Sequence, residues 1–273
     1  FTGRFVQRDI NKAIYYYTLA ANQNFPDAQV NLGNIYFFGQ FFPPNISKAI
    51  YYYSLAAEHN LIQAQLLLGW IYYNHKYSSF IINKAIYYFT LAAKQNDIRA
   101  QLILGQIYES NEYVPRDIDK AIYYYSCSAK QNLPIAQFLI GQIYFDDKLT
   151  QYDIKKALYY FSLAADQKCP EALLYLGKIY LEGIYIKKDI EKALNYLSLA
   201  ANQNSSEAQF ELGNIYLIGK FVQQDLNKAF HYYLLASYQN HSNSYIVLGL
   251  WYYYGISNIQ NYNKAINYLQ LAA

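Results

Sequence analysis

The chain has 273 residues, 54% of them hydrophobic and 15% charged, with a formal net charge of +3. A charge this small, without a run of lysine or arginine, argues against a nucleic-acid-binding protein. The longest apolar run, residues 245–256, is interrupted by Gly249 and is shorter than the roughly 18 residues that a membrane-spanning helix needs. We therefore expect a large core, no membrane span and no nucleic-acid partner.

The two cysteines, Cys127 and Cys169, lie far apart and at different positions of the repeat described below. A disulfide framework is therefore not expected, and a reducing compartment is favoured. No secretory signal is visible at the start of the sequence, so we expect a cytoplasmic protein. The sequence contains no methionine, which leads us to expect a fragment or a processed form of a longer chain.

An internal repeat organises the whole chain. A Lys-Ala pair returns every 36 residues without an insertion. Its lysines are Lys12, Lys48, Lys84, Lys120, Lys156, Lys192, Lys228 and Lys264. A second marker, usually Leu-Gly, keeps the same spacing, with glycine at positions 33, 69, 105, 141, 177, 213 and 249. Two markers in one register predict a solenoid, and each of its units contains two helical patterns.

The chain opens inside such a unit, because "GRFVQRD" from Gly3 matches "GKFVQQD" from Gly219. Residues 1–25 are therefore a partial repeat that contains only a second helix. Asp9 is the expected N-cap of this helix. The equivalent caps are Asn45, Asp117, Asp153, Asp189, Asp225 and Asn261, whereas Ile81 cannot cap. The expected helix ends are Asn24, Asn60, Asn96, Asn132, Asn204 and Asn240, with Lys168 as the departure.

Three consecutive tyrosines in this helix are predicted to differ in burial. Tyr16 is predicted to be structural core, because its position is tyrosine in every repeat. The members of this Tyr16 row are Tyr16, Tyr52, Tyr88, Tyr124, Tyr160, Tyr196, Tyr232 and Tyr268. The Tyr17 position accepts phenylalanine and leucine, which is typical of an apolar packing site. The Tyr15 position changes to Asn195, His231 and Asn267, and its acceptance of asparagine indicates partial exposure.

The first helix of each repeat is predicted from "DAQVNLGNIYFFG", residues 27–39. Ala28, Leu32, Ile35 and Tyr36 have the spacing of one helical stripe. Gly33 lies in mid-helix, where glycine costs about 1 kcal/mol relative to alanine, so we expect two helices to meet there too closely for a side chain. The expected helix ends are Gly39, His75, Asn111, Asp147, Gly183, Gly219 and Gly255.

These motifs resemble those of a known family. The pattern A-x-x-x-L-G-x-x-Y-x-x-G appears as "ALLYLGKIYLEG" from Ala172, and D-x-x-K-A-x-x-Y-x-x-A-A appears as "DIEKALNYLSLAA" from Asp189. The chain is similar to the Sel1-like repeat family, a relative of the tetratricopeptide repeats. The resemblance implies an all-α, right-handed superhelical solenoid of helix-turn-helix repeats. After the partial repeat 1–25, residues 26–273 are expected to form one continuous array of seven first and seven second helices, the last truncated.

The resemblance also implies a function. Such arrays look like adaptors, so we expect a non-catalytic scaffold that binds a protein or peptide. A regulatory module fused to a catalytic domain outside this sequence, such as a kinase, is the alternative. An enzyme of the family's cysteine-rich branch is nearly excluded, because the paired cysteines of that branch are missing. No cofactor is expected, and the four histidines have no metal-ligand spacing.

A partner site is expected on the first helices, which line the concave face in tetratricopeptide-like superhelices. By similarity, the residue after the Leu-Gly glycine points into that groove: Asn34, Trp70, Gln106, Gln142, Lys178, Asn214 and Leu250. Carboxamides donate and accept hydrogen bonds, and Trp70 with Tyr73 is a candidate anchor. Asn34 and Asn214 match the asparagine of the related carboxylate-clamp proteins, but the lysine and arginine companions of that clamp are missing. The alternative is a solvated polar face without a partner.

The Tyr15 position supplies a second candidate surface. The tyrosines of this Tyr15 row are Tyr15, Tyr51, Tyr87, Tyr123 and Tyr159. They are expected to stack as a ladder, either as an aromatic binding strip or, as we favour, half-buried between adjacent second helices. The ends of the array lack the polar outer face of capping repeats, so end-to-end association of the chain is a further hypothesis.

Overall fold

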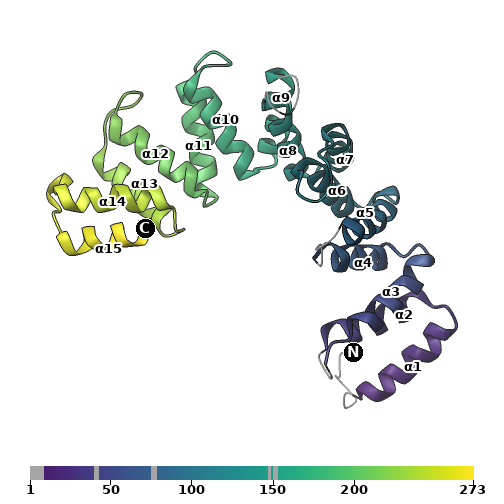
Figure 1. Ribbon diagram of the computed structural model, residues 1–273. Helices are drawn as coiled ribbons and strands as arrows, with labels where there is room; N and C mark the ends of the chain where they lie inside the picture. Colours follow the sequence, from purple (N-terminus) through teal and green to yellow (C-terminus); the bar gives the residue numbers. More distant parts are fainter. Residues whose placement is uncertain (1–8, 40–42, 75–78, 147–148, 150–152) are drawn as a thin grey trace. The chain divides into compact units, whose positions relative to one another are not determined.

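The computed structural model describes residues 9–39, 43–74, 79–146, 149 and 153–273. The described part is all-α, and its helices follow one another in pairs (Figure 1). The first helices are α2 (Pro26–Phe38), α4 (Ile62–Asn74), α6 (Ile98–Ser110), α8 (Pro134–Phe145), α10 (Pro170–Glu182), α12 (Ser206–Ile218) and α14 (Ser242–Tyr254). The second helices are α1 (Ile10–Asn22), α3 (Ile46–Glu58), α5 (Ser79–Lys94), α7 (Ile118–Lys130), α9 (Ile154–Asp166), α11 (Ile190–Asn202), α13 (Leu226–Ser237) and α15 (Tyr262–Ala272). A 3-10 turn, η1 (Ile256–Asn258), follows α14.

The chain divides into two compact units. Unit 1 comprises Phe1–Gln131, with α1 to α7, and unit 2 comprises Asn132–Ala273, with α8 to α15. Within each unit, a first helix packs most extensively on the second helix that follows it and less extensively on the second helix that precedes it. The predicted all-α array of paired helices is therefore confirmed.

The predicted N-caps of the second helices are confirmed. In α1 the Asp9 carboxylate accepts a hydrogen bond from the backbone N–H of Lys12 at 3.0 Å. The equivalent bond is made by Asn45, Asp117, Asp153, Asp189, Asp225 and Asn261. Ile81 lies inside α5, which begins two residues earlier at Ser79, so that helix does not use this position as its start.

The predicted helix ends also adopt the expected conformation. Asn24, Asn60, Asn96, Asn132, Lys168, Asn204 and Asn240 have φ values between 59° and 63°. The first helices end at left-handed Gly39, Asn111, Gly183, Gly219 and Gly255, while His75 and Asp147 lie outside the described residues. Asparagine tolerates this region better than most side chains, which explains its use in place of glycine.

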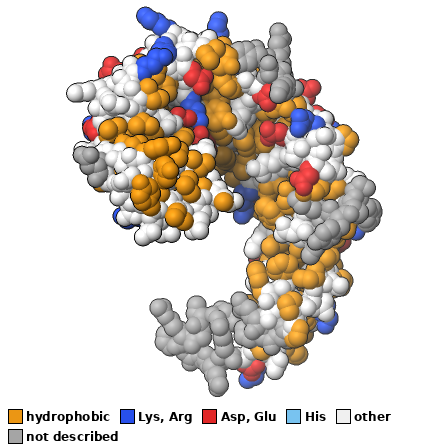
Figure 2. Space-filling view, turned by 60° about the vertical axis from the view of Figure 1, so that its left-hand side comes forward, with side chains coloured by type: hydrophobic (Ala, Val, Ile, Leu, Met, Phe, Trp, Pro, Cys, Tyr) orange, Lys and Arg blue, Asp and Glu red, His pale blue; other side chains and the backbone are white. Residues whose placement is uncertain are grey.

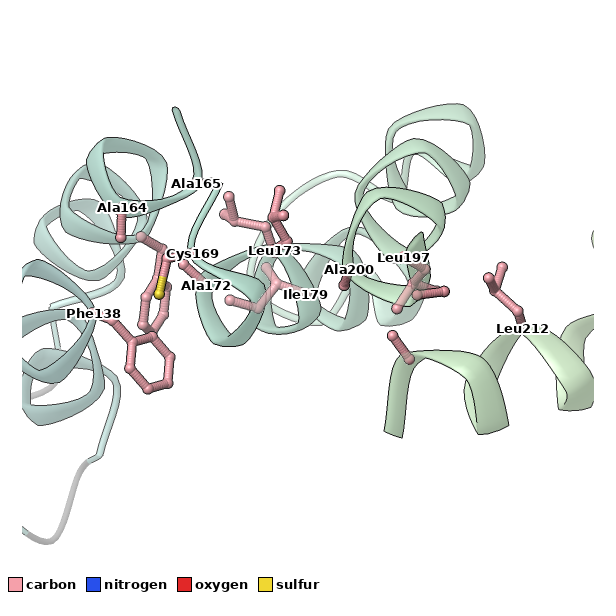
Figure 3. Packing of buried hydrophobic residues seen from close by; sticks show 14 of the residues in the cluster. Phe138, Ala164, Ala165, Cys169, Ala172, Leu173, Ile179, Leu197, Ala200 and Leu212 are labelled. Carbon is pink, nitrogen blue, oxygen red and sulfur yellow. The ribbon is translucent and has the colours of Figure 1, made fainter. Parts of the chain in front are cut away.

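The core is centred on the contact between the Leu-Gly glycine and the Tyr17 position. A methyl group added at Gly105 would lie 2.4 Å from the ring of Tyr125, and Gly33 meets Tyr53 in the same way. The residues at the Tyr17 position are fully buried from α3 to α13: Tyr53, Phe89, Tyr125, Phe161, Leu197 and Tyr233. In unit 2, Phe138, Ala164, Leu173 and Leu197 belong to one continuous apolar cluster (Figure 3). The predicted close approach of the two helices is confirmed.

The Tyr16 row is not the core that the sequence analysis predicted. Tyr16 itself is 65% exposed, and the other members are half-buried. Each second helix from α3 to α15 instead stacks this tyrosine on the first-helix tyrosine equivalent to Tyr36, with ring centroids 5.7–6.2 Å apart. The Lys-Ala lysine lies 4.8–5.2 Å above that first-helix ring. The Tyr16 row therefore forms a layer of stacked rings at the edge of the core. The most buried residue of the three is the next one, at the Tyr17 position.

Buried glutamines connect successive repeats. The side chain of Gln101 donates to the carbonyl oxygen of Ala93 and accepts from the Gln131 side chain at 2.9 Å. The same glutamine-to-glutamine bond joins Gln95 to Gln65, Gln167 to Gln137 and Gln239 to Gln209. The position is Leu173 in α10 and Tyr245 in α14, so those first helices lack the carboxamide.

Candidate protein-binding surface

The first-helix row contains the seven residues that follow the Leu-Gly glycines. Its members are Asn34, Trp70 and Gln106 in unit 1 and Gln142, Lys178, Asn214 and Leu250 in unit 2. Trp70, Gln106 and Leu250 are exposed, and the other four are half-buried. Because every member is reached by solvent, each unit offers a polar surface, with one aromatic position in unit 1 and one aliphatic position in unit 2.

Two asparagines of the row are bonded to the core beneath them. The buried Tyr53 hydroxyl donates to Asn34 Oδ1 at 2.8 Å, and the buried Tyr233 hydroxyl donates to Asn214 Oδ1 at the same distance. Burial raises the pKa of both phenols, which keeps the hydroxyls protonated and able to donate. These asparagines therefore satisfy a core hydroxyl as well as facing solvent.

Trp70 combines exposure with a fixed packing. Its side chain is 41% exposed, and its ring meets Tyr73 and Phe89 edge to face, at centroid distances of 5.7 and 5.8 Å. Tyr73 also contacts Tyr113. The predicted neighbourhood of Trp70 and Tyr73 is confirmed, and Trp70 rests on the buried Phe89 while part of its ring stays accessible.

The two glutamines of the row differ in their contacts. Gln142 donates from Nε2 to the Tyr175 hydroxyl at 2.9 Å, on the next first helix. Gln106 forms no hydrogen bond with the described residues, because the Tyr125 hydroxyl beneath it donates to Glu109 instead, at 2.6 Å. Gln142 is thus held in place and Gln106 is not.

Lys178 belongs to an ionic network on unit 2. Its ammonium lies 2.7 Å from Glu207 and 3.1 Å from Glu211, and His241 lies 3.0 Å from Glu207. The hydrogen bond from Lys178 holds the pKa of the Glu207 carboxyl below its ordinary value, against the opposing effect of burial. Burial also opposes the charge on Lys178, but the two carboxylates outweigh it and raise the pKa of the ammonium.

The Tyr15 row is more exposed than the half-buried arrangement favoured above. The exposed fractions of Tyr15, Tyr51, Tyr87, Tyr123 and Tyr159 lie between 59% and 62%. Each ring contacts the next tyrosine in the chain edge to face, with centroids 5.1–5.3 Å apart. Within unit 1, the rings of Tyr15, Tyr51, Tyr87 and Tyr123 do not contact one another, so the predicted ladder is wrong there.

Neither a metal site nor a membrane span is found in the part of the chain that the structure describes. Histidine, cysteine and acidic side chains there form no group of three that could hold a metal ion. No described helix is long and apolar enough to cross a bilayer. On the face drawn in Figure 2, acidic and basic side chains are scattered among hydrophobic patches.

Several residues of this surface were missed by the sequence analysis. Glu207, Glu211 and His241 were not predicted to join Lys178, because pairing across 29 or more residues is set by the packing of successive first helices. The spacing does carry a signal, since Glu207 comes seven residues before the row member Asn214 and one helical turn before Glu211. The bonds from Tyr53 and Tyr233 have a weaker signal, because asparagine follows the Leu-Gly glycine only in repeats that carry tyrosine at the Tyr17 position.

Comparison with known proteins places this geometry in a family. The Sel1 repeat model matches residues 1–25, 26–61, 62–97, 98–133, 134–169, 170–205, 206–241 and 242–273. The chain is similar to the crystal structure of a Sel1 repeat protein from Oxalobacter formigenes, with 30% identity and a TM-score of 0.88 over 97% of this chain and 78% of that one.

A second similar structure is c5321, a protective antigen present in uropathogenic Escherichia coli strains that displays an SLR fold. The identity is 26% and the TM-score 0.80, over all of this chain, which spans 58% of that protein's length. The curated proteins contain no match. Because the family's repeat is matched from residue 1 to residue 273, the chain belongs to the Sel1 repeat family.

Proposed function

We propose that the chain is a non-catalytic scaffold whose first-helix row binds a protein or peptide partner. Repeats of this kind present one side chain per repeat along a continuous surface, and repeat membership supports a binding role in general. The observation that carries the proposal is Trp70. An exposed tryptophan held edge to face on a buried aromatic ring is the kind of anchor that dominates protein interfaces.

The surrounding row supports a peptide as the partner. Asn34 and Gln106 occupy the equivalent positions of the repeats on either side of Trp70. Carboxamides bond readily to peptide groups, so a segment anchored on Trp70 would find polar contacts in both neighbouring repeats. The row in unit 1 carries no charge, which favours a partner segment that is neutral at these positions.

The test is selection of binders from a phage-displayed random dodecapeptide library on the full chain. The selected peptides are then synthesised, and their affinities are measured by fluorescence anisotropy. We expect Trp70→Ala to weaken binding at least tenfold, in the range typical of an interface anchor. The matched control is Tyr87→Ala, on the second helix that packs against α4. If Tyr87→Ala weakens binding and Trp70→Ala does not, the site lies on the Tyr15 row and the proposal is wrong.

A further inference from the structure

A buried hydroxyl bonded to a surface asparagine occurs twice, once in each unit. Tyr53 and Tyr233 are 0% exposed, and each donates its hydroxyl proton to the Oδ1 atom of the row asparagine in its own repeat at 2.8 Å. Leaving a buried hydroxyl without a partner costs free energy. The asparagine oxygen is therefore held towards the core by a group that has no access to solvent.

The row changes its residue type with the core position beneath it. Where phenylalanine or leucine replaces the tyrosine, the row residue is not asparagine, as in the pairs Phe89–Trp70, Phe161–Gln142 and Leu197–Lys178. The remaining buried tyrosine, Tyr125, donates to Glu109 and leaves Gln106 unbonded. Asparagine thus occurs in the row only where a core hydroxyl bonds to it.

This hydrogen bond fixes the orientation of the side-chain carboxamide in both asparagines. A carboxamide offers one acceptor oxygen and two N–H donors, and a free surface carboxamide presents either end by rotating. In Asn34 and Asn214 the oxygen is engaged, so the Nδ2 donors point away from the tyrosine. Neither Nδ2 group forms a hydrogen bond with the described residues. Each asparagine is therefore an open donor whose orientation is set before a partner arrives.

We propose that Tyr53 is a positioning residue that makes Asn34 a fixed hydrogen-bond donor for a main-chain carbonyl oxygen of an extended partner segment bound on unit 1. This inference rests on the proposed binding function of the row. Preorganised donors raise affinity because less side-chain freedom is lost on binding. A carbonyl fits better than a carboxylate, since the unit 1 row has no cation and the only lysine of the unit 2 row is engaged by Glu207 and Glu211.

The experiment uses the full chain and peptides selected as described under Proposed function. Tyr53→Phe removes the tether in unit 1, and Asn34→Asp replaces the donor by an acceptor of the same size. Tyr233→Phe removes the equivalent tether in unit 2 and serves as a first control. Tyr125→Phe is the matched control, because its hydroxyl bonds to Glu109 rather than to the row. Thermal denaturation of each variant, and the side-chain amide resonances of Asn34 and Asn214 in ¹H–¹⁵N spectra, are recorded alongside.

For peptides whose binding depends on Trp70, we expect Tyr53→Phe to weaken binding about three- to tenfold and Asn34→Asp to weaken it more. Tyr125→Phe and Tyr233→Phe should leave it unchanged. The Asn34 side-chain resonances should move in Tyr53→Phe and stay in Tyr125→Phe, which a change in stability alone would not produce. Equal binding of these peptides by wild type and Tyr53→Phe would overturn the inference and leave the proposed function standing. Binding that also ignores Trp70→Ala, or a library that yields no binder, would overturn both.

Discussion

The first-helix rows of the two units share one frame and differ in chemistry. In unit 1 the row is uncharged and centred on Trp70, which packs on Tyr73 and Phe89. In unit 2 the middle of the row is Lys178, bonded to Glu207 and Glu211 on the next first helix. Asn34 and Asn214 nevertheless occupy equivalent positions of their repeats, and each accepts a hydrogen bond from a buried tyrosine.

This difference shows which positions of the repeat accept different side chains. The glycine, the residue at the Tyr17 position and the alanines of the second helix meet at contact distance, so their sizes are fixed by packing. The row position lies at the edge of this core, where each side chain contacts the core on one side and remains partly exposed on the other. A tryptophan and a lysine can therefore occupy equivalent positions without altering the helix pair.

The largest expected effect is a loss of stability when the Leu-Gly glycine, which both units share, is replaced by alanine. A methyl group at Gly105 would lie 2.4 Å from the Tyr125 ring, whereas at Gly177 it would lie 2.7 Å from the more adaptable Leu197 side chain. Gly105→Ala should lower the free energy of unfolding by about 2–3 kcal/mol, and Gly177→Ala by about 1 kcal/mol, after the gain in helix propensity. Urea denaturation followed by circular dichroism measures both, and equal losses would show that the aromatic contact is no tighter than the aliphatic one.

The next largest effect is a pH-dependent loss of stability that is expected in unit 2, where Lys178 pairs with Glu207. Since the folded-state pKa of Glu207 is lowered, its stabilisation is complete above its unfolded pKa and is lost as the pH falls through the folded value. Lys178→Met should therefore cost up to about 1 kcal/mol at pH 7 and progressively less below about pH 4.5. Thermal unfolding followed by Trp251 fluorescence reports on unit 2. A cost that does not depend on pH would mean that the lysine stabilises by packing.

The two tryptophans allow each unit to be followed alone. Trp70 is 41% exposed in unit 1, and Trp251 is 1% exposed in unit 2. Trp251→Phe should leave red-shifted emission that iodide quenches, and Trp70→Phe should leave blue-shifted emission that iodide does not quench. Trp70→Phe should change stability by less than about 0.5 kcal/mol. Protection of Trp70 from iodide would contradict the exposed anchor on which the proposed function depends.

The smallest effect is a difference in the alkylation rates of the two cysteines, which is measured on the folded wild-type protein. Cys169 in unit 2 is buried, and burial raises the pKa of its thiol to about 11, whereas Cys127 in unit 1 is partly exposed. Iodoacetamide at pH 8 should label Cys127 first, because the thiolate is the reactive form. Mass spectrometry of digested protein gives the two rates, and equal labelling would contradict the burial of Cys169.

The helix boundaries and the packing within each helix pair could be predicted from the sequence because their signals recur from repeat to repeat. The Asp9-type caps, the asparagine helix ends and the close approach at Gly33 each recur in register, so coincidence could be discounted. Burial within "YYY" was placed one residue too early, since invariance at Tyr16 reflects stacking on Tyr36 and the lysine above it rather than core packing. The ionic network at Lys178 depends on packing between successive repeats, which no single repeat reveals. The bonds to Asn34 and Asn214 lie within one repeat but depend on how its two helices pack.

The buried glutamines also bear on how such an array can lengthen. Where Gln95, Gln131, Gln167 and Gln239 each bond to a glutamine 30 residues earlier, a duplicated repeat inserted at the junction brings both partners with it. Gln203, 30 residues after Leu173, has no carboxamide at the matching position and lies exposed. Duplication at a glutamine junction therefore keeps an inter-repeat hydrogen bond, worth about 0.5–1.5 kcal/mol, that a junction at Leu173 does not have.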